Sequence, residues 1–104
     1  MRLPCRGQYS KNQKHLMRKC GYAEFRDPVT KKMSYVRLFQ PRNYYPRFHV
    51  YLEDAQDGFV VDLHLDQKKP SYSGSSAHAG EYDGPVVEQE LKRIFVIIRQ
   101  HRIG

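Results

Sequence analysis

The chain has 104 residues, of which 28% are charged, and a formal net charge of +7 at pH 7. This length predicts a single domain of two structural layers and excludes a second domain. No segment approaches the roughly 18 consecutive apolar residues of a membrane-spanning helix, and residues 1–13 lack the apolar run of a secretory signal, so we expect a cytoplasmic protein with no membrane partner.

The first twenty residues form a basic segment. They contain six of the eighteen Lys and Arg residues and no Asp or Glu, whereas residues 21–104 contain twelve Lys and Arg residues against eleven acidic ones. Because residues 1–20 include few apolar side chains, we expect a flexible basic arm before a single domain at 21–104. The arm would bind phosphates through its cations, which release counterions from a polyanion, or would be a solvated tail. These cations are Arg2, Arg6, Lys11, Lys14, Arg18 and Lys19.

Two cysteines, Cys5 and Cys20, lie within the same segment. Neither belongs to a CxxC pair, so the sequence predicts no zinc site built on cysteine. In a cytoplasmic protein we expect two reduced thiols, and a disulfide would require export.

Residues 21–27 and 33–40 alternate between polar and apolar side chains around a turn at 28–32, which predicts a β-hairpin. If Arg26 lies opposite Met33, then Ala23 pairs with Val36 and Phe25 with Ser34. The other face would carry aromatic and basic side chains, namely Tyr22, Arg26, Tyr35, Arg37 and Phe39. Residues 41–47 have a proline at each end and are predicted to be a connection.

A second hairpin is predicted over residues 48–66, with its turn at 55–58. Its register follows from three apolar pairs, because a one-residue slip would turn every side chain to the other face. These pairs are Phe48 with Leu65, Val50 with Leu63, and Leu52 with Val61. The same register places His49 opposite His64, Tyr51 opposite Asp62, and Glu53 opposite Val60 on the remaining face.

Residues 67–84 form a long polar loop, which contains His78, Glu81 and Tyr82. Loops of this length are commonly functional or disordered. Pro85 then begins a helix that we expect to extend to about residue 101. Its apolar side chains recur at spacings of three and four and form one stripe, made of Val87, Leu91, Ile94, Phe95 and Ile98.

The predicted fold class is therefore α+β, with the order β-β-β-β-α. Two hairpins would form a four-stranded antiparallel sheet, and the C-terminal helix would cover one face of it. The covered face would carry Ala23, Phe25, Val36, Leu38, Val50, Leu52, Val61 and Leu63. The opposite face would remain open, or be covered only by residues 1–20 and 67–84.

Aromatic rings beside guanidinium groups on an open sheet are typical of single-stranded nucleic-acid binding, since bases stack on the rings and arginines bind phosphates. Tyr22, Arg26, Tyr35, Arg37 and Phe39 would form this surface together with the basic arm. The primary functional hypothesis is thus a small nucleic-acid-binding protein, with RNA favoured over DNA because unpaired bases suit an open sheet. The alternative is that the rings pair across strands to stabilise the sheet.

A second hypothesis is catalysis. His49 and His64 could act as general base and general acid in a metal-independent ribonuclease, with Asp62 orienting an imidazole and Tyr51 stabilising the transition state. The spacing matches no recognised metal motif, so no metal and no cofactor are assigned. The candidate ligands for a metal would be His49, His64 and His78 with Asp62 or Glu81.

A third hypothesis is a protein-interaction module. An exposed aromatic patch could bind a protein partner or form a homodimer. The patch would consist of Tyr22, Tyr35, Phe39 and Tyr51.

Overall fold

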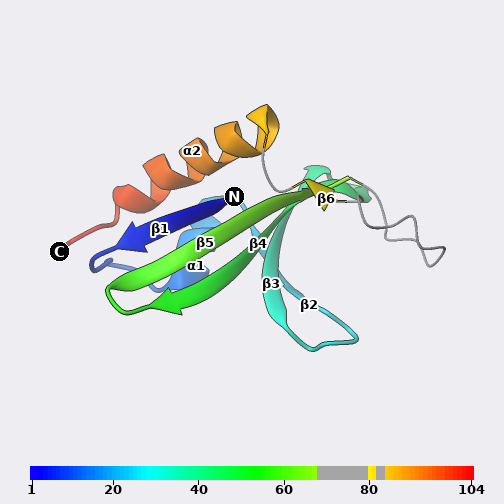
Figure 1. Cartoon of the computed structure of the whole chain (residues 1–104). Coiled ribbons are helices and arrows are strands. Elements are labelled where there is room, and N and C mark those ends of the chain that lie inside the picture. Colours follow the sequence, from blue (N-terminus) through cyan, green and yellow to red (C-terminus); the bar gives the residue numbers. More distant parts are fainter. Residues whose placement is uncertain (68–79, 82–83) are drawn as a thin grey trace.

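The computed structural model describes residues 1–67, 80–81 and 84–104 (Figure 1). These residues form one antiparallel sheet and two helices. In chain order the elements are β1 (Arg2–Arg6), α1 (Gln13–Lys19), β2 (Ala23–Arg26), β3 (Met33–Gln40), β4 (Asn43–Ala55), β5 (Gly58–Asp66), β6 (Gly80–Glu81) and α2 (Pro85–Arg99). The α+β class and the C-terminal helix are confirmed.

The strands lie in the order β1-β5-β4-β3-β2, and the two-residue β6 also pairs with β5. The sheet therefore has five main strands rather than the predicted four. The additional strand, β1, comes from the segment that was predicted to be a flexible arm. It pairs antiparallel with β5, with Leu3 opposite Val61 and Cys5 opposite Phe59.

The prediction of a flexible arm at residues 1–20 was wrong, because its few apolar residues are spaced to reach the core. Leu3 and Cys5 alternate along β1 and face the core side of the sheet. In α1, Leu16 and Met17 are fully buried. The helix begins after Asn12, whose side chain accepts a hydrogen bond from the backbone N–H of His15 at 2.8 Å.

Pro4 sits in the middle of edge strand β1. The backbones of Met1 and Leu63 exchange two hydrogen bonds, both of 2.8 Å, so the alternate residues Arg2, Pro4 and Arg6 direct their backbone groups away from β5. A proline lacks the N–H group that would otherwise be presented at this edge. Its position therefore disrupts no pairing and opposes addition of a further strand.

Both predicted hairpins form in the predicted register. In β2 and β3, Arg26 lies opposite Met33 and Phe25 opposite Ser34. In β4 and β5, His49 lies opposite His64 and Tyr51 opposite Asp62. The second turn is shorter than predicted, because Ala55 and Gly58 are themselves paired. A β-carbon on Gly58 would lie 2.0 Å from the backbone oxygen of Cys5, so the close approach of β1 requires glycine here.

The predicted connection at 41–47 is instead largely the start of β4, which begins at Asn43. Arg47 lies opposite Asp66, the last residue of β5. Among the residues that the structure describes, the stretch of β4 before Arg47 extends beyond β5 and pairs only with β3. Pro46 is tolerated because this part of β4 is locally an edge.

The two helices pack on the same side of the sheet, and the core lies between them and the strands. Val87, Ile94 and Ile98 of α2 are buried against Val50 and Leu63 of the central strands. Full burial of each aliphatic side chain contributes roughly 1.5–3 kcal/mol, which fixes this face as the inner one. None of the helices in the described residues is long and apolar enough to span a bilayer.

The first hairpin presents the opposite face from the one predicted. Tyr35 lies opposite Val50 and Arg37 opposite Phe48, so Tyr35 and Arg37 are on the helix side. Tyr22 and Tyr35 are buried there, whereas Ala23 is exposed and Phe25 lies on the same face as His49. The predicted open surface with Tyr22 and Tyr35, and the interaction patch built on them, therefore do not exist.

Candidate functional site

Four side chains meet on the sheet face that the helices leave uncovered, and we call them the histidine cluster: Arg47, His49, His64 and Asp66. They come from β4 and β5, where His49 pairs with His64 and Arg47 pairs with Asp66. The rings of His49 and His64 have centroids 5.0 Å apart. Tyr51 stacks on the His49 ring at 4.7 Å.

Asp66 is the centre of this cluster. Its Oδ2 lies 3.0 Å from Nε of Arg47 and 2.9 Å from Nδ1 of His49, and its Oδ1 lies 3.3 Å from Nε2 of His64. Partial burial on its own would raise the pKa of Asp66. The hydrogen bonds from His49, His64 and Arg47 outweigh burial and bring this pKa far below its ordinary value. Asp66 is therefore a carboxylate at neutral pH.

His49 is fixed from two sides. Its Nε2 lies 2.7 Å from Oγ of Ser34, and the Ser34 hydroxyl is 3.1 Å from the backbone carbonyl of Phe25, to which it can donate. The Phe25 ring stands edge-on to His49 at 6.0 Å, and the Arg47 guanidinium lies 4.9 Å from the same phenyl ring. His49 is 5% exposed and His64 is 8% exposed. The sequence predicted that both histidines lie on an open face, whereas the structure shows that both are buried.

The predicted carboxylate partner, Asp62, lies elsewhere. It is 3.8 Å from both the N-terminal amine and the Arg2 guanidinium. Sequence reasoning missed Asp66, although the period of two along β5 places Asp66, like Asp62, on the same strand face as His64. His78 and the side chain of Glu81 lie outside the described residues.

A groove of about 480 Å³ lies between β3 and α2, and its walls combine charge with aromatic surface. We call it the basic-aromatic groove. Arg37, Phe39 and Phe48 line it from the sheet, and Glu90 and Arg93 from α2. Phe39 is 45% exposed and packs against Phe48 with ring centroids 4.8 Å apart. Arg37 and Phe39 were predicted nucleic-acid contacts, whereas Arg93 was not.

Glu90 organises the floor of this groove, although it is only 5% exposed. It accepts hydrogen bonds from the Tyr22 hydroxyl at 2.7 Å and from Nε of Arg93 at 2.8 Å, and Nη1 of Arg37 lies 3.5 Å away. Burial and the Glu90 carboxylate both raise the pKa of Tyr22 far above its ordinary value, so this phenol remains a donor. Two guanidinium groups face one carboxylate, which leaves the groove with net positive charge.

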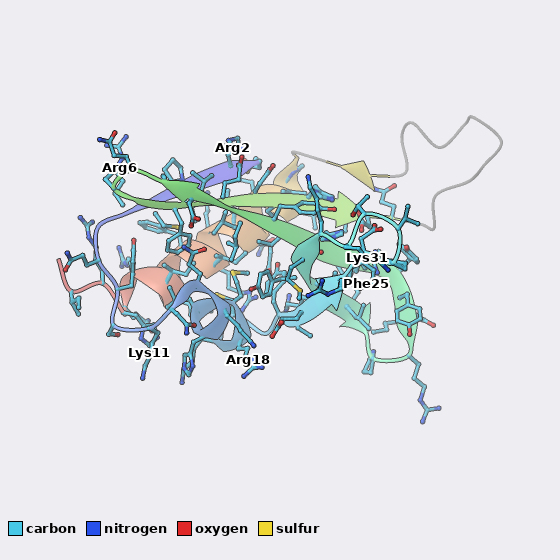
Figure 2. All side chains as sticks on the ribbon, turned by 90° about the horizontal axis from the view of Figure 1, so that it is seen from below. Arg2, Arg6, Lys11, Arg18, Phe25 and Lys31 are labelled. Atoms are coloured by element: carbon cyan, nitrogen blue, oxygen red, sulfur yellow. The ribbon has the colours of Figure 1, made fainter. Side chains whose placement is uncertain are left out.

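A basic surface runs along α1 and the two residues before it, and its exposed cations are Lys11, Lys14, Arg18 and Lys19. Figure 2 shows Lys11 and Arg18 projecting from the same side of the molecule. Lys14 and Arg18 share one carboxylate, that of Glu24, at 2.8 and 3.7 Å. Lys11 and Lys19 form no ion pair with the described residues. Slight desolvation and the cations around it lower the pKa of His15, which indicates a positive potential on this surface.

The other predicted phosphate contacts already have partners within the protein. Arg2 forms an ion pair with Glu53, and Arg6 lies 3.8 Å from Asp57. Arg26 donates to the backbone carbonyl of Lys31 at 3.5 Å. The cations of residues 1–20 are thus divided between the β1 edge, where acids oppose them, and the α1 surface, where they are in excess.

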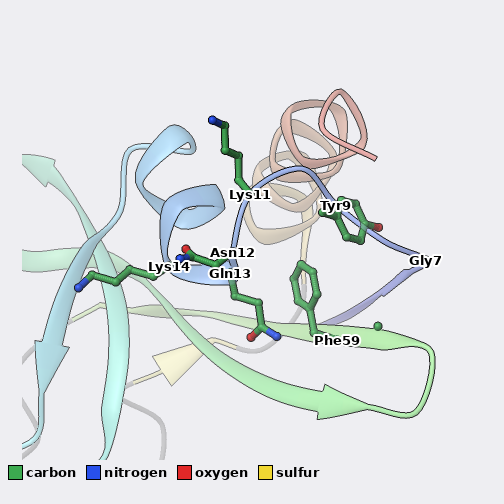
Figure 3. Close-up of a pocket in the computed structure, with 8 residues that line it drawn as sticks. Gly7, Tyr9, Lys11, Asn12, Gln13, Lys14 and Phe59 are labelled. Atoms are coloured by element: carbon green, nitrogen blue, oxygen red, sulfur yellow. The ribbon is translucent and has the colours of Figure 1, made fainter. Parts of the chain in front are cut away.

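A further hollow of about 480 Å³ lies below α1 (Figure 3). Tyr9 and Phe59 lie at one end of it and Lys14 at the other (Figure 3). The two rings contact each other edge-on at 5.5 Å. No residue here was predicted as an aromatic contact, because Tyr9 belongs to the segment that was expected to be flexible.

Comparison of the chain with protein-family models, with curated proteins and with solved structures found no match.

Proposed function

We propose that the protein binds single-stranded nucleic acid, and RNA in particular, at the basic-aromatic groove and the adjoining surface of α1. The observation that carries this proposal is the presence of two guanidinium groups beside a half-exposed phenyl ring in one groove. A base would stack on Phe39, and Arg37 and Arg93 would bind the phosphates on either side of it.

The charges of the groove support this proposal. Among the described residues, only Glu90 accepts a hydrogen bond from Arg37, whose side chain is 39% exposed. Most of the Arg37 donors are therefore available to a phosphate. Because the Glu90 carboxylate is buried and already accepts hydrogen bonds from Tyr22 and Arg93, it repels an approaching anion less than an exposed acid would.

The groove and the basic surface of α1 are continuous. The backbone carbonyl of Cys20, at the end of α1, accepts a hydrogen bond from Arg93. A β-carbon on Gly21 would lie 3.4 Å from Nε of Arg37, so the chain passes directly beside this guanidinium as it leaves α1. A strand that occupies the groove could therefore extend its phosphates along Lys19 and Arg18.

The first experiment measures binding of a fluorescently labelled oligouridine by anisotropy. Phe39→Ala should weaken binding by about 5- to 150-fold, because stacking of one base on an aromatic ring contributes about 1–3 kcal/mol. Tyr44→Ala is the matched control, since Tyr44 is a more exposed ring on β4 that does not line the groove. Equal affinities for the two variants would contradict the groove as the base site, and tighter binding of oligodeoxythymidine would contradict the preference for RNA.

Salt dependence tests the phosphate contacts separately. Each phosphate contact with a single strand contributes about 0.7 to the slope of log K against log salt concentration. Lys11→Gln/Lys19→Gln should therefore flatten the slope by about 0.7 for each lysine that contacts a phosphate. Lys31→Gln/Lys32→Gln, in the turn between β2 and β3, removes the same charge and should leave the slope unchanged. Affinity that is independent of salt would refute the proposal.

The alternative hypothesis, a ribonuclease that uses His49 and His64, has weaker support. Both ring nitrogens of His49 already have partners, in Asp66 and Ser34, and both histidines are buried. The ring separation of 5.0 Å nevertheless matches a pair that could flank one phosphate. The same labelled strands, analysed on a denaturing gel after incubation, decide between binding and cleavage.

A further inference from the structure

The histidine cluster contains a compact set of metal-ligand atoms. One nitrogen of His49, one of His64 and one carboxylate oxygen of Asp66 all lie within 4.8 Å of one another. Zinc bonds to histidine nitrogen and carboxylate oxygen are about 2.0–2.2 Å long, so neighbouring ligand atoms around a tetrahedral ion lie roughly 3.3 Å apart. Nδ1 of His49 lies 2.9 Å from Oδ2 of Asp66, and Nε2 of His64 lies 3.3 Å from Oδ1 of the same carboxylate. Small side-chain adjustments would therefore admit an ion.

The hydrogen bonds of His49 favour a cation beside its Nδ1. When the Ser34 hydroxyl donates to the backbone carbonyl of Phe25, its oxygen accepts the N–H of His49 Nε2. Nδ1 of His49 then faces Oδ2 of Asp66 at 2.9 Å, and either the proton of a hydrogen bond or a metal ion can lie between these two atoms. A hydrogen bond on the far ring nitrogen is also the arrangement that orients most metal-binding histidines.

The backbone presents these ligands on rigid elements. His49 and His64 are directly opposite each other on the paired central strands β4 and β5, and Asp66 is two residues further along β5. Phe25 and Tyr51 pack on the His49 ring and restrict its rotation. Ligands held on strands lose little conformational entropy when they bind an ion.

We propose that His49, His64 and Asp66 bind a divalent transition-metal ion of the zinc type. Two imidazoles with one carboxylate suit zinc or cobalt, whereas calcium and magnesium prefer six or more oxygen ligands. Oδ2 of Asp66, the oxygen nearest Nδ1 of His49, also accepts the hydrogen bond from Arg47, whose positive charge lowers the affinity of the site. Three protein ligands leave one position of a tetrahedral ion for water.

The test uses the full-length protein after treatment with a chelator, titrated with Co²⁺ in the absence of nucleic acid. A tetrahedral site should produce the intense visible absorption of Co²⁺, which Zn²⁺ should abolish by displacement. His64→Gln and Asp66→Asn should each weaken binding by at least about 100-fold, because each removes a ligand rather than an outer-shell partner, whose loss costs about 10- to 100-fold. His15→Gln, at a half-exposed position of α1 outside the histidine cluster, is the matched control and should bind as the parent does.

Parent protein that shows no tetrahedral Co²⁺ absorption and no rise in Tm with Zn²⁺ would overturn the proposal, and a proton between His49 and Asp66 would then explain the geometry. Co²⁺ affinity that is equal in the parent and in His64→Gln would also overturn it. If either His64→Gln or Asp66→Asn prevents folding, the other variant and the titration of the parent protein still test the proposal. Since no nucleic acid is present, this result is independent of the proposed function.

Discussion

Glu90 is a buried carboxylate, and the side chains that contact its oxygens come from both layers of the protein. Arg93 lies on its own helix, whereas Tyr22 and Arg37 reach it from the sheet side of the core. A buried charge is stable only when its hydrogen bonds are made, because an unsatisfied group retains its full desolvation penalty. Glu90 therefore forms the floor of the basic-aromatic groove and also connects α2 to the first hairpin.

Removing one of these donors should be costly. Tyr22→Phe keeps the ring but deletes the hydroxyl that donates to Glu90, so we expect a loss of about 1–3 kcal/mol in the free energy of unfolding. Urea denaturation measures this difference. The matched control is Tyr9→Phe, whose hydroxyl donates to the backbone carbonyl of Arg6 at an exposed position and should contribute less. Equal losses of unfolding free energy in Tyr22→Phe and Tyr9→Phe would mean that the hydrogen bond to Glu90 does not stabilise the fold more than the exposed one does.

At the scale of single residues, the sequence predicted which histidines pair but not which acid joins them. The alternation of β4 and β5 placed His49 opposite His64, and strand geometry alone required it. The choice of Asp62 followed from its position opposite Tyr51, whereas the packing of Arg47 and both histidines around Asp66 depends on contacts across the strands. Glu90 was missed although it occupies the apolar stripe between Val87 and Ile94, where an acid must find a buried partner.

At the scale of elements, α1 shows that a basic segment can still be part of the core. Leu16 is fully buried in the cluster that α2 and the sheet form. We therefore expect Leu16→Ala to lower the free energy of unfolding by about 2–5 kcal/mol, the usual range for a large-to-small change in a core. Lys19→Ala on the exposed side of α1 should change it by less than about 0.5 kcal/mol. If both variants unfold at the same urea concentration, α1 does not contribute to the core.

The two hairpins were predictable and their assembly was not. Within a hairpin the apolar pairs and the turn fix the register, so local sequence suffices. Between hairpins, both faces of β2 and β3 offer comparable apolar surface, and the choice depends on contacts with distant residues. Tyr22 and Tyr35 face the helices because their rings bury more area than Ala23 and Val36, and because Glu90 accepts the Tyr22 hydroxyl.

At the scale of the whole molecule, one core holds together segments from both ends of the chain. Residues of β1 and α1 pack in the same cluster as α2, so the N-terminal segment completes the domain rather than extending from it. Both cysteines are part of this cluster, at 4% and 1% exposure, and neither forms a disulfide. The thiols therefore report on the integrity of the complete fold.

Burial raises the pKa of both Cys5 and Cys20 from 9.0 to about 11. Because the thiolate is the reactive form and both buried thiols are almost entirely protonated at pH 8, Ellman's reagent should modify the native protein slowly and only when the core opens. The folded state binds these protons more tightly than the unfolded state, so their contribution to stability is complete below pH 9 and is lost as the pH rises toward 11. The urea concentration at the midpoint of unfolding should therefore fall as the pH is raised from 9 toward 11. Rapid labelling of both thiols in native protein at pH 8 would show that the N-terminal segment detaches from the core.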